Sequence, residues 1–130
     1  MIVVDASAML EVLLNSPAAA AIGSRMFAPG EALHAPHLID VEVMEVLRRY
    51  SIAKSLSTAR ARQALEDYVN MPIERFPHDV LLPRIWELRH NLTAYDAAYI
   101  ALAEGLDAPL ITCNRALGSA VGHRATVLVF

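Results

Sequence analysis

Short apolar segments rich in β-branched residues alternate with longer segments of helical periodicity, and this alternation most constrains the fold. The segments that we predict as strands are residues 1–4, 32–35, 73–76, 110–112 and 126–130. The segments that we predict as helices are residues 7–14, 17–27, 37–50, 57–71, 79–90, 94–105 and 115–121. Strands that alternate with helices in this way form parallel sheets with helices on both faces. We therefore predict an α/β protein, a three-layer α/β/α sandwich with a central parallel sheet.

Individual residues predict where some of these helices begin and end. Ser57 and Thr93 have side chains that favour the N-cap position, directly before a helix. Pro17 suits the first turn of the second helix, where its missing N–H has no cost. We expect Gly105 to end the helix that begins at residue 94, because glycine favours helix termination.

Length and composition predict one domain, residues 1–130, with an interface for another chain. The chain has 130 residues, of which 55% are hydrophobic, and a mean hydropathy of +0.37, which is high for so small a chain. No apolar run reaches the roughly 18 residues of a membrane span, and the N-terminus does not resemble a signal peptide. We therefore expect no membrane association and a homodimer that buries apolar helix faces. The single cysteine, Cys113, excludes an intramolecular disulfide and indicates a reducing cytoplasm.

The charge balance argues against a protein that holds nucleic acid through a broad basic surface. The net charge is −3, whereas such binding depends on phosphate neutralisation by Lys and Arg. An acidic nuclease remains compatible with this charge, because bound metal ions reverse the local charge at the scissile phosphate. Additional basic surface would then be local, for example Arg48-Arg49 or Arg60 with Arg62.

Carboxylates lie at the ends of separate predicted elements. Asp5 follows the first strand, Glu42 lies in the helix 37–50, and Asp96 opens the helix 94–105. An ionised carboxylate among apolar neighbours is costly unless it is paired, hydrogen-bonded or bound to a cation. Parallel sheets bind ligands outside the carboxyl ends of their strands, so Asp5 and the segment 112–114 are expected to be neighbours.

Each of these carboxylates also has a purely structural explanation. Asp5 can cap the following helix, and Asp96 falls at the third helical position after Thr93, where a carboxylate favours the helix dipole. Periodicity places Glu42 and Asp40 equally far from the apolar stripe of their helix, so it does not choose between them. Further out on the same helix, Glu45 is expected to pair with Arg49.

Three motifs resemble the PIN-domain family, especially its small VapC-type toxins. They are Val4-Asp5-Ala6-Ser7, Val41-Glu42 and Thr93-Ala94-Tyr95-Asp96-Ala97. The resemblance implies a PIN-like fold and an Mg²⁺- or Mn²⁺-dependent endoribonuclease, the toxin component of a type II toxin–antitoxin system. It also selects Glu42 over Asp40.

The same resemblance implies the site residues and the partners. Asp5, Glu42 and Asp96 would be the catalytic residues and metal ligands. Ser7, Thr112 and Asn114 would be auxiliary residues. The implied partners are an RNA substrate, a second copy of the chain and a VapB-type antitoxin that covers the acidic pocket with a basic side chain.

One departure from the family pattern leaves an alternative function open. The family usually carries an acidic residue where this chain has Asn114, so the pocket loses one negative charge. The alternative is a catalytically weak or inactive PIN-fold module that binds RNA or protein. A phosphatase of haloacid-dehalogenase type is disfavoured, because it needs a second Asp where this chain has Ser7. Zinc binding by His34 and His37 is disfavoured as well, and no Gly-rich phosphate loop is present.

Overall fold

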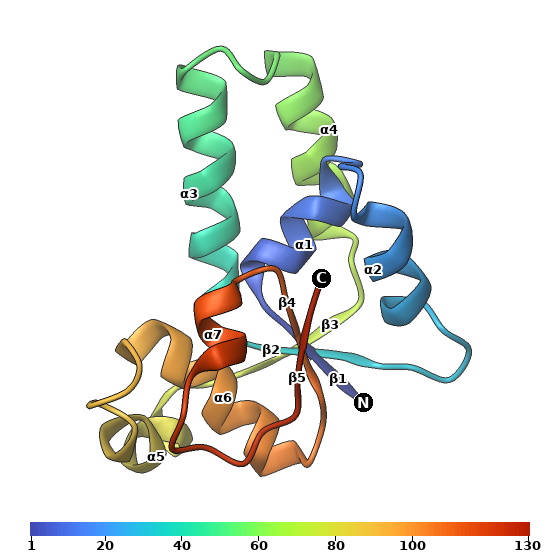
Figure 1. Cartoon of the computed structure of the whole chain (residues 1–130). Helices are drawn as coiled ribbons and strands as arrows, with labels where there is room; N and C mark the ends of the chain where they lie inside the picture. The colour runs from blue at the N-terminus through green and yellow to red at the C-terminus, as the bar shows by residue number, and fades with distance from the viewer.

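The computed structural model describes all 130 residues and contains one five-stranded parallel sheet (Figure 1). The strands are β1 (Ile2–Val4), β2 (Leu33–Pro36), β3 (Ile73–Phe76), β4 (Leu110–Thr112) and β5 (Val127–Val129), and they lie in the order β3-β2-β1-β4-β5. The helices are α1 (Ala6–Leu13), α2 (Ala19–Met26), α3 (Ile39–Ile52), α4 (Thr58–Val69), α5 (Leu82–Glu87), α6 (Ala94–Leu106) and α7 (Arg115–Ser119). A single 3₁₀ turn, Asp79–Leu81, precedes α5.

The helices cover both faces of the sheet, as the alternating pattern predicts. Figure 1 shows α1, α2, α3 and α4 on one side of the sheet, and α5 and α6 on the other. The hairpin formed by α3 and α4 projects away from the sheet. The predicted three-layer α/β/α sandwich is therefore confirmed.

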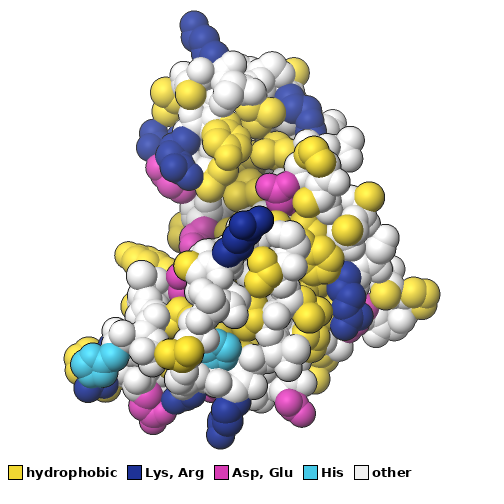
Figure 2. Space-filling model, viewed as in Figure 1, with side chains coloured by type: hydrophobic (Ala, Val, Ile, Leu, Met, Phe, Trp, Pro, Cys, Tyr) yellow, Lys and Arg dark blue, Asp and Glu magenta, His cyan; other side chains and the backbone are white.

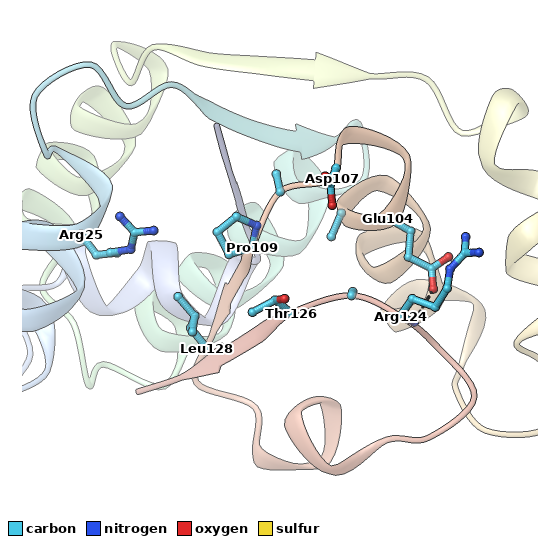
Figure 3. A pocket seen from close by; sticks show the side chains of 10 residues that line it. Arg25, Glu104, Asp107, Pro109, Arg124, Thr126 and Leu128 are labelled. Carbon is cyan, nitrogen blue, oxygen red and sulfur yellow. Dashed lines mark hydrogen bonds between the residues drawn. The ribbon is translucent and has the colours of Figure 1, made fainter.

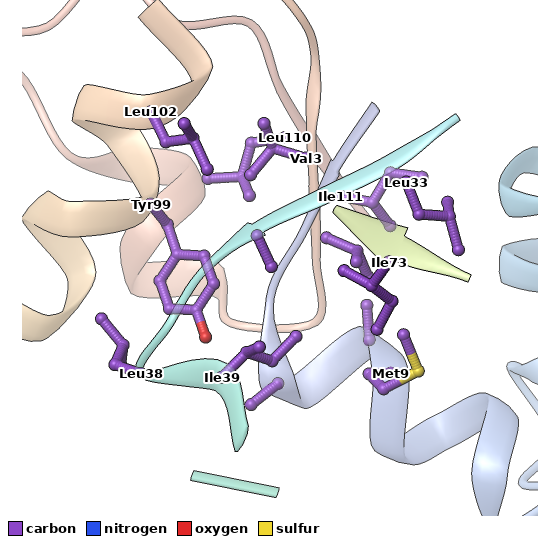
Figure 4. Close-up of a cluster of buried hydrophobic side chains, with 14 of the residues drawn as sticks. Val3, Met9, Leu33, Leu38, Ile39, Ile73, Tyr99, Leu102, Leu110 and Ile111 are labelled. Atoms are coloured by element: carbon purple, nitrogen blue, oxygen red, sulfur yellow. The ribbon is translucent and has the colours of Figure 1, made fainter. Parts of the chain in front are cut away.

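The core surrounds the central strand β1, which pairs with β2 on one side and β4 on the other. All of β1 is inaccessible to solvent, because helices cover both faces of the strand. Figure 4 shows how side chains of the sheet meet those of the helices, with Met9 of α1 and Tyr99 of α6 among them. This packing fixes the carboxyl ends of β1 and β4 side by side.

Two predicted helix starts are confirmed by their caps. The Ser57 side chain accepts a hydrogen bond from the backbone N–H of Arg60, at 3.1 Å. The Thr93 side chain accepts one from the backbone N–H of Asp96, at 3.2 Å. Each cap satisfies a backbone donor that the helix itself leaves unpaired.

Other predicted boundaries were wrong. The helix expected over 79–90 is a 3₁₀ turn followed by the short α5, because Pro83 cannot donate to the preceding turn of an α-helix. Gly105 does not end α6, which continues to Leu106 and ends at Asp107 with a left-handed φ of 50°. Pro17 lies in a turn before α2 rather than in its first turn. The last helix, α7, ends at Ser119 rather than at residue 121.

None of the helices is both long and apolar enough to cross a bilayer.

Candidate active site

Asp5 lies at the junction of β1 and α1, on the carboxyl edge of the sheet. One of its oxygens, Oδ1, accepts hydrogen bonds from the backbone N–H of Ala8 at 3.0 Å and from Ser7 Oγ at 2.7 Å. The other, Oδ2, accepts one from Thr112 Oγ1 at 2.5 Å. The two strands are neighbours and parallel, so their carboxyl ends bring Asp5 and Thr112 together. Only 6% of Asp5 is exposed, and these donors fix its orientation.

Ser7 and Thr112 form a small hydroxyl network around Asp5, as expected from their place at the strand edge. Their oxygens lie 3.3 Å apart. Ser7 Oγ also accepts from the backbone N–H of Cys113 at 2.9 Å, and Thr112 Oγ1 accepts from the backbone N–H of Asn114 at 2.9 Å. The network therefore ties the start of α1 to the end of β4.

Glu42 is held from the opposite layer by Tyr99, a residue of α6. The Tyr99 hydroxyl donates to Glu42 Oε1 at 2.6 Å. Sequence reasoning missed Tyr99 as part of the site. The available signal was its position three residues after Asp96, which places both side chains on the same face of α6.

Asp40, the other candidate carboxylate of α3, is engaged elsewhere. Its Oδ1 accepts from Arg75 Nε at 2.9 Å and from the Tyr68 hydroxyl at 2.6 Å. The burial and hydrogen bonding of that hydroxyl raise the pKa of Tyr68. Glu42 has no such cationic partner. The structure thus separates two carboxylates that helical periodicity left equivalent.

The expected ion pair between Glu45 and Arg49 was wrong. Glu45 pairs with Arg48 instead, whose Nε and terminal NH₂ group each lie 2.9 Å from a carboxylate oxygen. Positions three apart are as close on a helix surface as positions four apart, and here the nearer arginine takes both oxygens. Arg49 is consequently left without a carboxylate partner.

Asp96 is the third helical residue of α6, after the Thr93 cap, as predicted. Burial raises the pKa of its carboxyl group, and a hydrogen bond with Thr93 partly opposes that shift. Burial likewise raises the pKa values of Asp5 and Glu42. Repulsion from the charge of Asp96 contributes to the raised pKa of both Asp5 and Glu42. Repulsion from the charge of Asp5 contributes further to the raised pKa of Glu42.

The carboxylates of Asp5, Glu42 and Asp96 therefore lie close enough to repel one another. None of the three forms an ion pair with a Lys, Arg or His side chain. Figure 2 shows acidic side chains at the neck between the α3–α4 hairpin and the rest of the molecule, with a basic side chain beside them. The three carboxylates themselves are therefore not neutralised by an ion pair within the protein.

Asn114 is the N-cap of α7. Its Oδ1 accepts a hydrogen bond from the backbone N–H of Ala116 at 3.1 Å. The amide thus has a structural role that is sufficient to explain it. The neighbouring Cys113 is partly buried, and burial raises the pKa of its thiol, so it is not set up as a nucleophile.

The donor atoms of the site fit a hard divalent cation. No three His, Cys, Asp or Glu side chains in the structure converge into a ready-made ligand cluster. Mg²⁺, however, is typically bound by one or two carboxylates, with water and substrate phosphate completing its shell. Asp5, Glu42 and Asp96 supply carboxylates of this kind at one edge of the sheet.

Two hollows in the surface differ in their relation to these carboxylates. A groove of about 440 Å³ runs between α1 and α3 and is lined at one end by Ser7 and Glu42. A larger cavity, about 560 Å³, lies at the amino ends of β4 and β5 (Figure 3). Two acidic residues, Glu104 and Asp107, line it, and Glu104 accepts hydrogen bonds from Arg84 and from the backbone N–H of Arg124. None of the three candidate carboxylates lines that cavity, so the carboxyl edge is the candidate active site.

Comparison with known proteins places the chain beside one group of ribonucleases. The PIN domain family matches residues 2–121. Ribonuclease VapC12 of Mycobacterium tuberculosis is 39% identical over 127 residues, which cover 98% of this chain and 97% of that protein. Ribonuclease VapC9 of the same organism is 46% identical over 114 residues, which cover 88% and 86% of the two chains.

Solved structures share the fold. The VapBC2 structure from Rickettsia felis, bound to a DNA fragment from its promoter, contains a chain that superposes with a TM-score of 0.73 at 12% identity. The match covers 99% of this chain and 98% of that one. PAE2754 from Pyrobaculum aerophilum superposes with a TM-score of 0.70 at 23% identity, over 97% of this chain and 81% of its own.

Proposed function

This chain belongs to the PIN domain family, and from that premise we propose that it is a metal-dependent endoribonuclease, the toxin of a type II toxin–antitoxin pair. The resemblance read from the sequence motifs is confirmed by this membership. The relatives named as VapC ribonucleases align over nearly the whole chain. The observation that carries the proposal is the carboxyl edge itself, where Asp5, Glu42 and Asp96 face one region without any ion-pair partner.

The protein's contribution to RNA hydrolysis is the fixed placement of these carboxylates. Asp5 is held by three donors, and Glu42 by the Tyr99 hydroxyl. Asp96 stands on the rigid first turn of α6. Side chains restrained in this way can bind a cation without a large loss of conformational freedom.

Mg²⁺ or Mn²⁺ would be held by Asp5, Glu42 and Asp96, with Asn114 as an auxiliary ligand. When bound, the cation supplies Lewis-acid activation of the phosphodiester and a lowered pKa for water. Ser7 and Thr112 orient Asp5 through their hydrogen bonds. The raised pKa values of the three carboxylates indicate that their negative charges are better accommodated with a cation present.

A VapB-type antitoxin and a second copy of the chain are the proposed protein partners. The acidic region at the neck suits a basic antitoxin side chain. Several large apolar side chains are exposed, among them Val69 at 69% and Trp86 at 67%, and supply surface for an interface. The single, unpaired Cys113 is compatible with action in the cytoplasm.

The alternative function is a PIN-fold module that binds RNA or protein but cuts weakly. Asn114 favours it, because its side chain caps α7 and adds no negative charge to the site. The two functions differ in one measurable property, the rate of metal-dependent RNA cleavage.

The decisive experiment compares RNA cleavage by the parent protein and by Asp96→Asn, with Mg²⁺, with Mn²⁺ and with EDTA. We expect the parent to cleave only with a divalent cation, and the variant to be inactive. The variant should fold normally, because the Thr93 cap is unchanged, and circular dichroism checks this. Parent activity that persists in EDTA would rule out the metal-dependent mechanism. A well-folded parent that binds RNA without cutting it would favour the alternative.

A further inference from the structure

The groove between α1 and α3 continues from the candidate active site to a pair of unengaged side chains, Arg49 and Tyr50. The wall formed by α3 consists of Glu42, Glu45, Val46, Arg49 and Tyr50. These are positions i, i+3, i+4, i+7 and i+8 of one helix, which share a single face. The other wall consists of Ala6, Ser7, Leu10 and Glu11 of α1.

The far end of the groove lies at a defined distance from the carboxylates. Arg49 is seven positions after Glu42, and at 1.5 Å per residue this is about 10 Å along the helix axis. One end of the groove is thus formed by residues of the candidate active site, and the other by a cation and an aromatic ring. A polymer bound at the active site would pass along this groove.

The side chains of Arg49 and Tyr50 make no hydrogen bond or ion pair within the fold. The Arg49 side chain is exposed and makes no hydrogen bond or ion pair, unlike Arg48, which is bound to Glu45. Tyr50 is 42% exposed, and its hydroxyl has no hydrogen-bond partner. A free guanidinium and an exposed aromatic ring that line one groove are the combination that holds single-stranded nucleic acid, through phosphate contact and base stacking.

The acidic residues of the groove are partly compensated. The charge of Glu45 is neutralised by Arg48, and Glu11 accepts a hydrogen bond from Ser16. Uncompensated negative charge is therefore concentrated at the Glu42 end, where the proposed cation would bind. Figure 2 shows basic side chains on the α3 side of the projecting hairpin, above the acidic neck. This polarity favours a phosphate-bearing strand over a basic protein segment at the Arg49 end.

We propose that this groove is a subsite for a nucleotide that flanks the cleaved phosphodiester, with Tyr50 stacking on its base and Arg49 contacting a phosphate. The subsite rests on the proposed ribonuclease function. It concerns residues that lie outside the catalytic carboxylates, so it can be tested separately from them.

The test measures kcat and KM for a single-stranded RNA of randomised sequence, labelled with a fluorophore and a quencher, in the presence of Mn²⁺. We expect Tyr50→Ala to raise KM about 5- to 150-fold, the range that removal of a base-stacking ring produces, with a smaller effect on kcat. Tyr50→Phe keeps the ring and should behave as the parent. Arg49→Ala should raise KM and reduce the salt dependence of log(kcat/KM) by about 0.7, the loss expected for one phosphate contact on a single strand.

Arg124→Ala is the matched control, since Arg124 is also an exposed arginine but lines the cavity at the amino ends of β4 and β5. It should leave both KM and the salt dependence unchanged. If Tyr50→Ala fails to fold, the salt dependence of Arg49→Ala still decides. The subsite would be overturned if the parent cleaves RNA and both Arg49→Ala and Tyr50→Ala match it in KM and salt dependence. The same result is expected if a protein segment, and not RNA, occupies the groove. A parent that does not cleave RNA would instead contradict the proposed function.

Discussion

Replacement of Tyr99 by phenylalanine tests whether Glu42 is a charge held ready for a cation. The change removes only the hydroxyl that donates to Glu42 Oε1 at 2.6 Å, and the buried ring is retained. Glu42 has no cationic partner, so the variant leaves a partly buried carboxylate without its donor. A hydrogen bond to a charged group contributes about 1.5–3 kcal/mol, and we expect a loss of that size in the free energy of unfolding at neutral pH.

The matched control is Tyr68→Phe. That hydroxyl also donates to a carboxylate, Asp40, at 2.6 Å, but Asp40 keeps its ion pair with Arg75. The control should therefore cost less, about 0.5–1.5 kcal/mol. Urea denaturation of both variants and the parent, in EDTA, measures the difference.

The pH dependence of the loss has a definite sign. Burial raises the pKa of Glu42 in the folded protein above its unfolded value, so the ionised form is the less favourable one in the fold. Tyr99 stabilises that ionised form. The cost of Tyr99→Phe is therefore greatest above the folded pKa and fades as the pH falls through it.

Saturating Mn²⁺ should also reduce the cost of Tyr99→Phe, because the cation would replace the lost donor as a partner of Glu42. Equal losses in Tyr99→Phe and Tyr68→Phe, unchanged by acid and by Mn²⁺, would refute the reasoning. Glu42 would then be an ordinary surface carboxylate.

Three further outcomes are expected. Asn114→Asp keeps an N-cap side chain for α7 and adds a negative charge, so it should melt lower than the parent in EDTA and gain more from Mn²⁺; equal gains would remove residue 114 from the metal site. Light scattering should show a particle of twice the 14.2 kDa chain mass at micromolar concentration, and a monomer would contradict the proposed homodimer. Glu104→Gln should destabilise the fold at neutral pH, because Arg84, 2.7 Å away, lowers the pKa of Glu104. That stabilisation is present above the unfolded pKa and is lost as the pH falls through the folded one, so urea denaturation should show the variant and the parent converging in acid.

Local sequence signals predicted the elements of this fold and the edge at which the candidate site lies. Strands of β-branched residues separated by helices imply a parallel sheet, and a parallel sheet places all its carboxyl ends together. For that reason Asp5 and Thr112, more than 100 positions apart, could be expected to meet, and they are hydrogen-bonded. The caps at Ser57 and Thr93 were predictable because capping involves only residues within one turn of each other.

Helix boundaries were less predictable where two local signals compete. Gly105 favours helix termination, yet it remains helical in α6. The helix ends one residue later, at Leu106, because Asp107 adopts the left-handed conformation. Pro83 interrupts the helix expected over 79–90, since it lacks the N–H that the preceding turn requires. In both cases the conformation of a neighbouring residue sets the boundary, and a single residue's propensity does not.

The sequence by itself determined which residue types and which sheet edge could form a cation site, because strand and helix periodicities are local properties of the chain. Only the tertiary structure decided which carboxylate of α3 remains available. Arg75 and Tyr68 come from β3 and α4 to engage Asp40, whereas Tyr99 comes from α6 to hold Glu42. Periodicity describes one helix at a time, so it contains no information about side chains that reach that helix from elsewhere. The charge that Asp5, Glu42 and Asp96 leave unneutralised is therefore a property of the folded chain.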